Sequence, residues 1–420
     1  MMQKSILYFL LLLISNQLEA QTIYKPKGCS ASVGPGVSSV VLHHPQDRYQ
    51  LITIKWADIE PSPGVFTFTE LANQINTVSS YNKKYALAIA SGGTGSPAWL
   101  IDSLHVPYIN YLFQGTIPSR LALWWDNIVQ QRLSLMITAL GNHFANDTSL
   151  ALVYVTQMTV NGNEGHLNGI NMTTMYNNGF TPTNWINAAK QTTYCYAKSF
   201  PDKALAFEVH DIDNSNDIPS TIINDLYNDS TLCQRVGAAM WWLSGKTSYQ
   251  NDLLNTLQNF KGDKYAQLIG KSSQPERFRD GLIKTAFEQA KQLGIRYIEP
   301  WLYEYQNNTI NASLLDFNNW TDEQFTSYDT CKNNSTGWNE HIYENNILIY
   351  PNPASEFLNI ENSGSQNIQG KAQIINTLGS LVKKINFQQN EQINVSELAK
   401  GVYFVHFKDF SHQRLKFMKQ

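Results

Sequence analysis

Short apolar runs alternate with longer amphipathic stretches from about residue 50 to residue 301. The apolar runs cover residues 51–56, 85–91, 150–160, 204–210, 236–245, 264–273 and 295–301. Runs of this length, separated by helical patterns, predict parallel strands that are buried on both faces and covered by helices.

The intervening segments have helical spacing. Leu71, Ile75 and Val78 recur on one face, and residues 119–144 form a long helical stretch. After the run at 264–273, Ser273 and Glu276 predict a capping box with Pro275 in the first turn. The inner stripe of that helix is predicted to be Phe278, Leu282, Ala286, Ala290 and Leu293, and Gly294 is predicted to end it.

Adding a first strand within residues 28–42 gives eight β/α units. Eight units in about 280 residues predict an α/β fold, a (β/α)8 TIM barrel. A doubly wound sheet is the rival, but SVGPGVSS (32–39) lacks the glycine spacing of its phosphate turn. In a barrel the chemistry lies where the strands end, so the residues closing each apolar run are the candidates.

The pattern changes after an Asn-rich segment at 306–345. Short strands with turn signals about every ten residues then predict a small all-β, immunoglobulin-like sandwich. We expect a signal peptide (1–20), the barrel (21–330), a linker (331–345) and the C-terminal module (346–420).

The N-terminus combines a basic start (MMQK), the apolar stretch SILYFLLLLIS and a polar end at Ala20. This pattern is typical of a signal peptide, and no later run approaches the ~18 apolar residues of a membrane span. We expect an exported, soluble mature chain.

The amino-acid composition limits the classes of ligand and partner that the chain is expected to bind. Charged residues make up 15% and the net charge is −3, which gives no reason to expect nucleic acid or an anionic membrane. With 10 Trp and 21 Tyr among many amides and hydroxyls, the surface suits neutral, hydroxyl-rich ligands. The plainer interpretation is an Asn-rich secreted protein.

Cys29, Cys195, Cys233 and Cys331 form an even set. In an exported chain they permit two disulfides with three pairings, or four free thiols. None of their spacings resembles a zinc site, and we expect no metal and no cofactor.

The C-terminal module contains an ordered set of short motifs: Tyr350–Pro353, Leu358–Ile360, Asn376–Gly379, Leu398 with Lys400–Val405, and Arg414–Phe417. On these motifs it resembles the type A sorting domain of the type IX secretion system of Bacteroidetes. The resemblance implies export across both membranes by that machinery, with the module cleaved or used for surface attachment. The alternative is a spacer or sugar-binding module.

Three stretches of the predicted barrel form a recognisable pattern: KWADIEPSPGVFTF (55–68), SPAWL (96–100) and Asn163-Glu164. On these motifs the barrel resembles the retaining (β/α)8 glycoside hydrolases, including β-galactosidase- and cellulase-like enzymes. The resemblance implies that Glu164 is the acid/base and that Asn163 binds a sugar 2-hydroxyl. Glu60 is interpreted as a structural acid that hydrogen-bonds backbone.

Glycoside hydrolysis requires two carboxyl groups, one of which must stay protonated to donate a proton. Glu164 follows a long apolar run without a neighbouring Lys or Arg. The alternative is a loop acid that caps the next helix through backbone N–H groups.

The family places its nucleophile after strand seven, where this chain has Gly270, Lys271 and Ser272. Glu299 is therefore the predicted second carboxylate, with Glu304 and Glu208 as further candidates. The alternative for Glu299 is a structural or hydroxyl-binding acid.

Further substrate-binding candidates are His166, Glu208, His210, Trp99, Trp241 and Trp301. Aromatic side chains can stack on sugar faces, although each can equally be barrel packing. Strand alternation allows only one of Trp241 and Trp242 to face the site.

Three functions remain open. The first is a secreted glycoside hydrolase acting on a neutral oligo- or polysaccharide. The second is a surface-displayed barrel that binds carbohydrate without cleaving it, which the missing strand-seven acid favours. The third is a metal-dependent enzyme using His210 and Asp211 of EVHD.

Overall fold

The computed structural model describes residues 22–331, 347–362, 369–377, 380–388, 391–407 and 414–420. The predicted signal peptide and nearly all of the predicted linker lie outside these residues.

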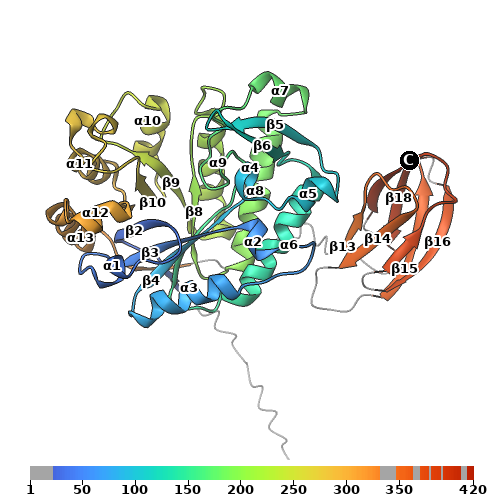
Figure 1. The fold of residues 1–420 in the computed structure, drawn as a ribbon, viewed down its shortest axis with the longest axis horizontal. Coiled ribbons are helices and arrows are strands. Elements are labelled where there is room, and N and C mark those ends of the chain that lie inside the picture. The colour runs from blue at the N-terminus through green and yellow to red at the C-terminus, as the bar shows by residue number, and fades with distance from the viewer. Residues whose placement is uncertain (1–21, 332–346, 363–368, 378–379, 389–390, 408–413) are drawn as a thin grey trace, which may run out of the picture.

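Eight parallel strands close into a barrel, as the apolar runs predict (Figure 1). In chain order they are β2 (Gly28–Pro35), β3 (Tyr49–Lys55), β4 (Lys84–Ala90), β7 (Leu150–Tyr154), β8 (Ala204–Glu208), β9 (Val236–Leu243), β10 (Lys264–Leu268) and β11 (Tyr297–Glu299). The TIM-barrel prediction is confirmed, with β10 as the seventh barrel strand and β11 as the eighth.

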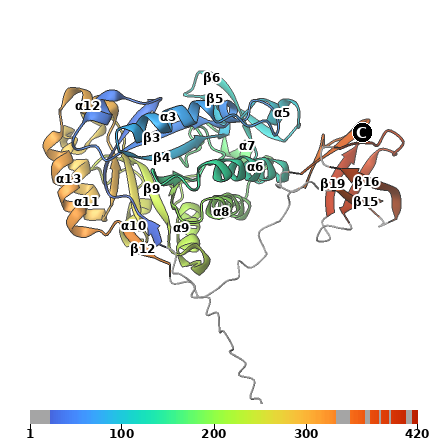
Figure 2. The same cartoon turned by 90° about the horizontal axis from the view of Figure 1, so that it is seen from below.

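Helices surround the strands, which the view from below makes plain (Figure 2). The longer ones are α3 (Thr69–Ser80), α6 (Asn127–Phe144), α8 (Pro182–Ser199), α9 (Asp217–Asn228), α10 (Asn251–Asn259), α11 (Lys284–Leu293) and α13 (Asn311–Gln324). Shorter helices are α1 (Ser39–His43), α2 (Trp56–Ile59), α4 (Gly92–Gly95), α5 (Trp99–Asp102), α7 (Met172–Asn177) and α12 (Leu302–Asn307). Leu71, Ile75 and Val78 are buried, as their spacing predicts.

The helical prediction for residues 119–126 is wrong. Strands β5 (Tyr108–Phe113) and β6 (Ile117–Ala122) form an antiparallel hairpin after β4. The next helix, α6, begins only after Asp126, whose side chain accepts hydrogen bonds from the N–H groups of Ile128 and Val129 at 2.9 and 3.2 Å. The N-cap therefore decides where the helix starts.

The predicted capping box at Ser273 is also wrong. Residues Pro275–Arg277 and Arg279–Gly281 form 3₁₀ turns, and α11 begins at Lys284. Asp280 has a positive φ of 56°, which interrupts helical geometry, and Leu282 is exposed. The helix does end at Gly294, whose φ is 68°.

The barrel interior is filled by alternating large and small side chains, as the tapering space requires. Tyr49, Tyr154, Tyr265 and Tyr297 lie among alanines from β4, β8 and β9. Strand β1 (Thr22–Tyr24) pairs with β12 (Tyr328–Thr330), and the hydroxyl of Tyr24 lies 2.7 Å from that of Tyr49. The interior is thus a packed core.

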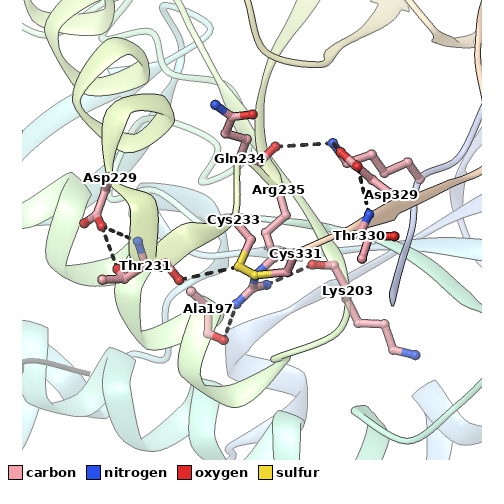
Figure 3. The surroundings of a disulfide bond; sticks show 11 residues. Ala197, Lys203, Asp229, Thr231, Cys233, Gln234, Arg235, Asp329, Thr330 and Cys331 are labelled. Carbon is pink, nitrogen blue, oxygen red and sulfur yellow. Dashed lines mark hydrogen bonds and ion pairs between the residues drawn. A yellow bond between two sulfur atoms is a disulfide. The ribbon is translucent and has the colours of Figure 1, made fainter. Parts of the chain in front are cut away.

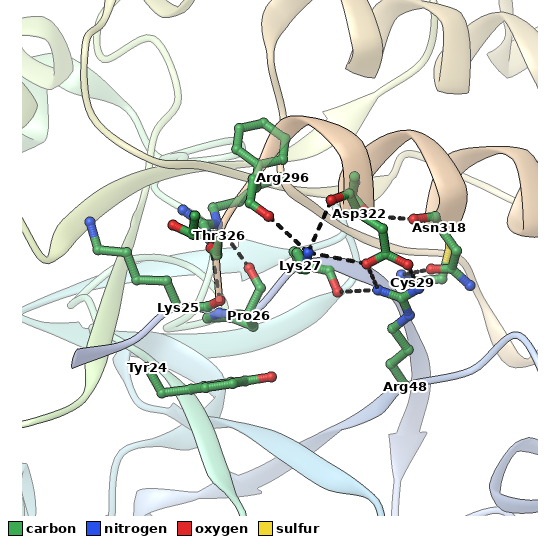
Figure 4. Close-up of polar contacts among 12 residues, drawn as sticks. Tyr24, Lys25, Pro26, Lys27, Cys29, Arg48, Arg296, Asn318, Asp322 and Thr326 are labelled. Atoms are coloured by element: carbon green, nitrogen blue, oxygen red, sulfur yellow. Dashed lines mark hydrogen bonds and ion pairs between the residues drawn. The ribbon is translucent and has the colours of Figure 1, made fainter. Parts of the chain in front are cut away.

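Charged side chains join the first strands to the last helix (Figure 4). Arg48 makes a two-pronged ion pair with Asp322 at 2.8 and 2.6 Å, and Lys27 donates to the carbonyl of Phe325 at 2.8 Å. Asn318 of α13 accepts from the N–H of Cys29 at 2.8 Å. These contacts hold α13, near the end of the barrel's chain, against the segments that lead into its first two strands, β2 and β3.

One disulfide forms, between Cys233 and Cys331 (Figure 3). Cys29 is free and buried, and Cys195 is free and half-buried, so the two-disulfide expectation is corrected to one. The neighbouring Arg235 donates to the carbonyls of Phe200 and Lys203 at 2.8 and 2.9 Å, which anchors the strand that follows Cys233.

The C-terminal module consists of two antiparallel sheets around one core. One sheet has the order β13-β14-β17 and the other β16-β15-β18-β19. The first sheet contains β13 (Ile347–Tyr350), β14 (Phe357–Asn362) and β17 (Glu391–Asn394). The second contains β16 (Leu381–Gln388), β15 (Gln369–Asn376), β18 (Gly401–Phe407) and β19 (Arg414–Lys419). The sandwich prediction is confirmed.

Candidate functional site

Glu164 lies in the segment that follows β7, the fourth barrel strand. Its Oε1 accepts from the Nδ2 of Asn161 at 2.8 Å, and its own N–H donates to the Oδ1 of Asn161 at 2.9 Å. Its carbonyl accepts from the hydroxyl of Thr159 at 2.6 Å. The side chain is 29% exposed, so the carboxyl group is held in place yet open to a ligand.

Glu208, the last residue of β8, lies beside the Glu164 segment and is fully buried. Its Oε2 accepts from the N–H of Gly165 at 2.6 Å and from the Nδ1 of His210 at 2.9 Å. Its Oε1 accepts from the N–H of Trp241 at 2.9 Å. Glu208 therefore joins strands five and six to the residue that follows Glu164.

The surroundings favour a protonated Glu164. Burial raises its pKa, and the negative charge of Glu208 raises it further, whereas His210 and the amide of Asn161 act in the opposite sense. The pKa of Glu208 is also raised well above its usual range by burial. Two interacting carboxyl groups of this kind titrate as a pair, and one of them retains its proton to higher pH.

The two predicted histidines contact these carboxyl groups. The Nε2 of His166 lies 3.6 Å from Glu164, and its ring packs edge-on against that of His210 at 5.2 Å. Burial lowers the pKa of each to about 4, so both are neutral at pH 7. Neutral His210 then donates its Nδ1 proton to Glu208.

Glu299 closes β11, the eighth strand, and is fully buried in the interior. Its Oε1 accepts from the hydroxyls of Tyr154 and Tyr297 at 3.0 and 2.8 Å, and its Oε2 from Gln267 at 3.2 Å. Burial raises its pKa to about 7, against the effect of these donors. No hydrogen bond or ion pair between described residues joins it directly to Glu164.

Trp241 contacts Glu208 through its backbone N–H and Tyr154 through its ring. It packs with the interior tyrosines, its ring 5.1 Å from that of Tyr154, which also binds Glu299. Trp242 instead lies in the outer core and donates to the carbonyl of Val209 at 2.8 Å. Only Trp241 of the pair faces inward, as strand alternation predicts.

The other two predicted tryptophans use their polar atoms within the fold. Trp99 donates to the carbonyl of Glu60 at 2.9 Å, and the guanidinium of Arg132 lies over its ring at 5.0 Å. Trp301 donates to the carbonyl of Leu268 at 2.7 Å. Both rings are partly exposed, so contact with a sugar stays a prediction.

The contacts of Glu60 give a structural reason for the motif KWADIEPSPGVFTF (55–68). Buried Glu60 accepts from the indole of Trp56 at 2.6 Å and the N–H of Gly64 at 2.9 Å, and it pairs with Arg132. Gly64 has a φ of 77°, which favours glycine. The structural interpretation of Glu60 is confirmed.

Asn163 is buried, and its Oδ1 has no hydrogen-bond partner among the described residues. This acceptor lies in the same loop as Glu164 but is itself buried, so a ligand hydroxyl reaches it only if the loop rearranges. Its predicted role in binding a sugar stays a prediction.

Gln267 was missed by the sequence reasoning. It is the inward-facing residue near the end of β10, where it donates to Ser32 at 3.1 Å as well as to Glu299. Its position in the apolar run, two residues after Tyr265, was the signal that could have found it. A carboxamide here means that the seventh strand offers no acid.

No group of three or more His, Cys, Asp or Glu side chains in the described residues is arranged to hold a metal ion. Within the same residues, no helix is long and apolar enough to cross a membrane.

Comparison with known proteins defines the C-terminal module first. Residues 348–419 match the family model of the secretion system C-terminal sorting domain. This module is a type IX sorting domain, which directs the chain to the cell surface or the exterior. No curated protein sequence matches the chain.

The barrel is similar to solved structures of low sequence identity. One is an intracellular xylanase from Thermoanaerobacterium saccharolyticum in complex with xylotetraose, at 14% identity and a TM-score of 0.41, over 66% of this chain and 86% of that one. Another is endo-glycoceramidase II from Rhodococcus sp., at 10% identity and 0.42, over 66% and 75%. A third is xylanase 10B from Thermotoga petrophila with xylobiose, at 11% and 0.39, over 66% and 82%.

Proposed function

We propose that the chain is a secreted glycoside hydrolase that cleaves a neutral oligo- or polysaccharide, with Glu164 as the general acid. The observation that carries the proposal is a partly exposed carboxyl group at the barrel mouth whose pKa is raised by burial and by the adjacent Glu208. A proton donor in glycoside hydrolysis needs these properties.

In the proposed reaction the proton of Glu164 passes to the glycosidic oxygen while the bond from that oxygen to the anomeric carbon breaks. The leaving sugar departs as an alcohol. As the glycosidic bond breaks, a second carboxylate either takes a proton from the water that attacks the anomeric carbon, or attacks that carbon itself. In the second case the resulting glycosyl-enzyme bond is broken by water, whose proton returns to Glu164. Asn163, whose Oδ1 is buried without a partner among the described residues, would bind a substrate hydroxyl once the loop exposes it.

Two buried carboxyl groups compete for the second role. Glu299 is the acid that the sequence favours, and three donors support its ionised form. Glu208 lies closer to Glu164 along the contact network, through Gly165. Because both side chains are fully buried, either must become accessible when substrate binds.

The proposal is tested by kinetics with two kinds of substrate. We expect Glu164→Gln to lower kcat by roughly 10²–10⁴ on unactivated oligosaccharides. On dinitrophenyl glycosides the loss should be much smaller, because that leaving group needs little protonation. Loss of the second carboxyl, in Glu299→Gln or Glu208→Gln, should abolish turnover of both substrates.

A non-catalytic carbohydrate-binding barrel is the second candidate. It is favoured by Gln267 on the seventh strand and by the burial of both Glu208 and Glu299. Binding of a neutral oligosaccharide by the parent chain, measured by calorimetry, with no release of reducing sugar over days, would establish this candidate and reject the hydrolase.

A further inference from the structure

A pocket of about 670 Å³ lies between the β5–β6 hairpin and the segment after β4. We call it the hairpin pocket, and its lining includes Ser96, Pro97, Asn110, Leu112, Ser119 and Arg120. Its volume falls within the range of small-molecule sites in proteins. None of the predicted acids, histidines or tryptophans lines it.

The hairpin pocket is built directly against the segment that carries Glu164. Tyr111, which lines the pocket, donates its hydroxyl proton to the carbonyl of Val160 at 2.8 Å. Gly93, which also lines the pocket, donates its N–H to the carbonyl of Thr159 at 2.9 Å. Thr159 in turn binds the carbonyl of Glu164. The pocket and the acid therefore share one short stretch of backbone.

This junction is tight. A Cβ atom added to Gly93 would lie 2.0 Å from the Tyr111 hydroxyl, and one added to Gly92 would lie 2.0 Å from the carbonyl oxygen of Thr159. Only glycine lets the wall of the pocket approach the hairpin and the acid segment so closely. The pocket is thus part of a packed unit and not a gap between loose loops.

The lining is neutral and mixed in character. The guanidinium of Arg120 is paired with Asp102 through two contacts at 2.5 and 3.1 Å, which cancels its charge. The remaining lining offers the exposed amide of Asn110, two serine hydroxyls and the aliphatic surfaces of Leu112 and the prolines. Amides and hydroxyls bind sugar hydroxyls, while C–H faces pack on apolar side chains.

We propose that the hairpin pocket is a remote subsite for a neutral glycan chain, so that the substrate of the Glu164 site is a polymer long enough to occupy both. The proposal rests on the proposed function for its substrate class. The occupant is a neutral saccharide because the paired Arg120 leaves no free charge in the lining to attract an anion.

The test separates binding from catalysis. Native affinity electrophoresis is performed in gels containing soluble xylan, mannan or hydroxyethyl cellulose, with carboxymethyl cellulose as the anionic comparison. The proteins carry Glu164→Gln, so that no polymer is cleaved during the run. The test variant adds Asn110→Ala and Leu112→Ala, both at exposed positions of β5, and the matched control adds Leu315→Ala on the exposed face of α13.

We expect at least one neutral polymer to retard the control, and the test variant to bind it roughly tenfold more weakly. In the parent background the double substitution should raise KM for that polymer and leave kcat/KM for an aryl monosaccharide within twofold. A filled pocket, in Ser119→Trp, should reproduce the loss.

The subsite is refuted if no neutral polymer retards the control, if the test variant binds as tightly as the control, or if carboxymethyl cellulose alone is bound. The two proposals can be rejected independently. If the subsite is absent, the polymers no longer retard the protein but aryl glycosides are still hydrolysed. If the hydrolase proposal is wrong, the parent is inactive but its binding to polymers can still be measured.

Discussion

Glu208 is coupled electrostatically to Glu164, because, in addition to burial, the ionised form of Glu208 raises the pKa of Glu164. A general acid must be protonated, so activity falls as the pH rises through the pKa of Glu164. Burial raises that pKa first, and the charge of Glu208 adds to it. We predict that Glu208→Gln lowers the pKa of Glu164 and moves the alkaline limb of the kcat/KM profile to lower pH.

The measurement is a pH–rate profile on an unactivated substrate, or a ¹³C-detected titration of Glu164 if turnover is lost. Glu288→Gln, which changes an exposed acid on α11, is the control and should leave the limb in place. An unchanged or raised alkaline limb in Glu208→Gln would show that the two acids are not coupled.

Glu60 and Arg132 form a buried ion pair, with exposed fractions of 0% and 1% for their side chains. Removing one partner leaves an uncompensated buried charge, which costs about 3–5 kcal/mol. We predict this loss of unfolding free energy for Glu60→Ala. Denaturant unfolding followed by tryptophan fluorescence reports on the barrel, because nine of the 10 Trp lie in residues 21–330 and none lies in residues 346–420.

Glu70→Ala is the matched control for Glu60→Ala, since Glu70 is exposed on α3 only ten residues further on. Its effect should stay within about 0.5 kcal/mol. If Glu60→Ala and Glu70→Ala lowered the free energy of unfolding equally, the buried contacts of Glu60 would not stabilise the fold more than an exposed side chain does.

At the residue scale, the sequence singled out individual acidic residues but not the residues that hydrogen-bond to them. Glu164, Glu208 and Glu299 all close apolar runs, which is a local signal. The contact of Glu208 with Gly165 and that of Tyr154 with Glu299 join residues 43 and 145 positions apart. Pairings of this kind depend on strand order and register, which no local pattern encodes.

Among the elements, α6 shows how one side chain sets a boundary. Asp126 accepts from two N–H groups at the start of the helix. Replacing such a cap by alanine costs about 0.5–2 kcal/mol. We predict that Asp126→Ala lowers the unfolding free energy by this amount, measured in denaturant, and that Asp126→Asn, which keeps the acceptor, restores most of it.

A loss in Asp126→Asn as large as that in Asp126→Ala would assign the effect to charge and not to capping.

The strands and most helices were predictable because apolar periodicity is a local property. The β5–β6 hairpin was not predictable in this way. Ile109, Tyr111 and Leu121 are buried because the hairpin packs against other parts of the fold, which is not a local property of the sequence. The helix start at Lys284 was misjudged for a similar reason. Ser273 and Glu276 match a capping box, but the positive φ of Asp280 breaks the helix between them and Lys284.

For the whole molecule, the Cys233–Cys331 disulfide closes a loop with a sequence separation of 98 residues. A cross-link of that span stabilises a fold by about 2–5 kcal/mol. We predict that the double variant Cys233→Ser/Cys331→Ser unfolds at lower denaturant than the parent, and that dithiothreitol lowers the parent to the same level.

Cys195→Ser changes a free, half-buried thiol and is the control. If dithiothreitol left the unfolding midpoint of the parent unchanged, the disulfide would have no part in stability.

The position of the disulfide also bears on maturation. Cys331 is the residue after β12, and β12 pairs with β1 at the other end of the barrel chain. If the sorting module is cleaved off during export, as its resemblance implies, the disulfide still ties Cys331 to Cys233. An exopeptidase that digests the new carboxyl end should therefore stop at Cys331, before it reaches the pairing of β12 with β1.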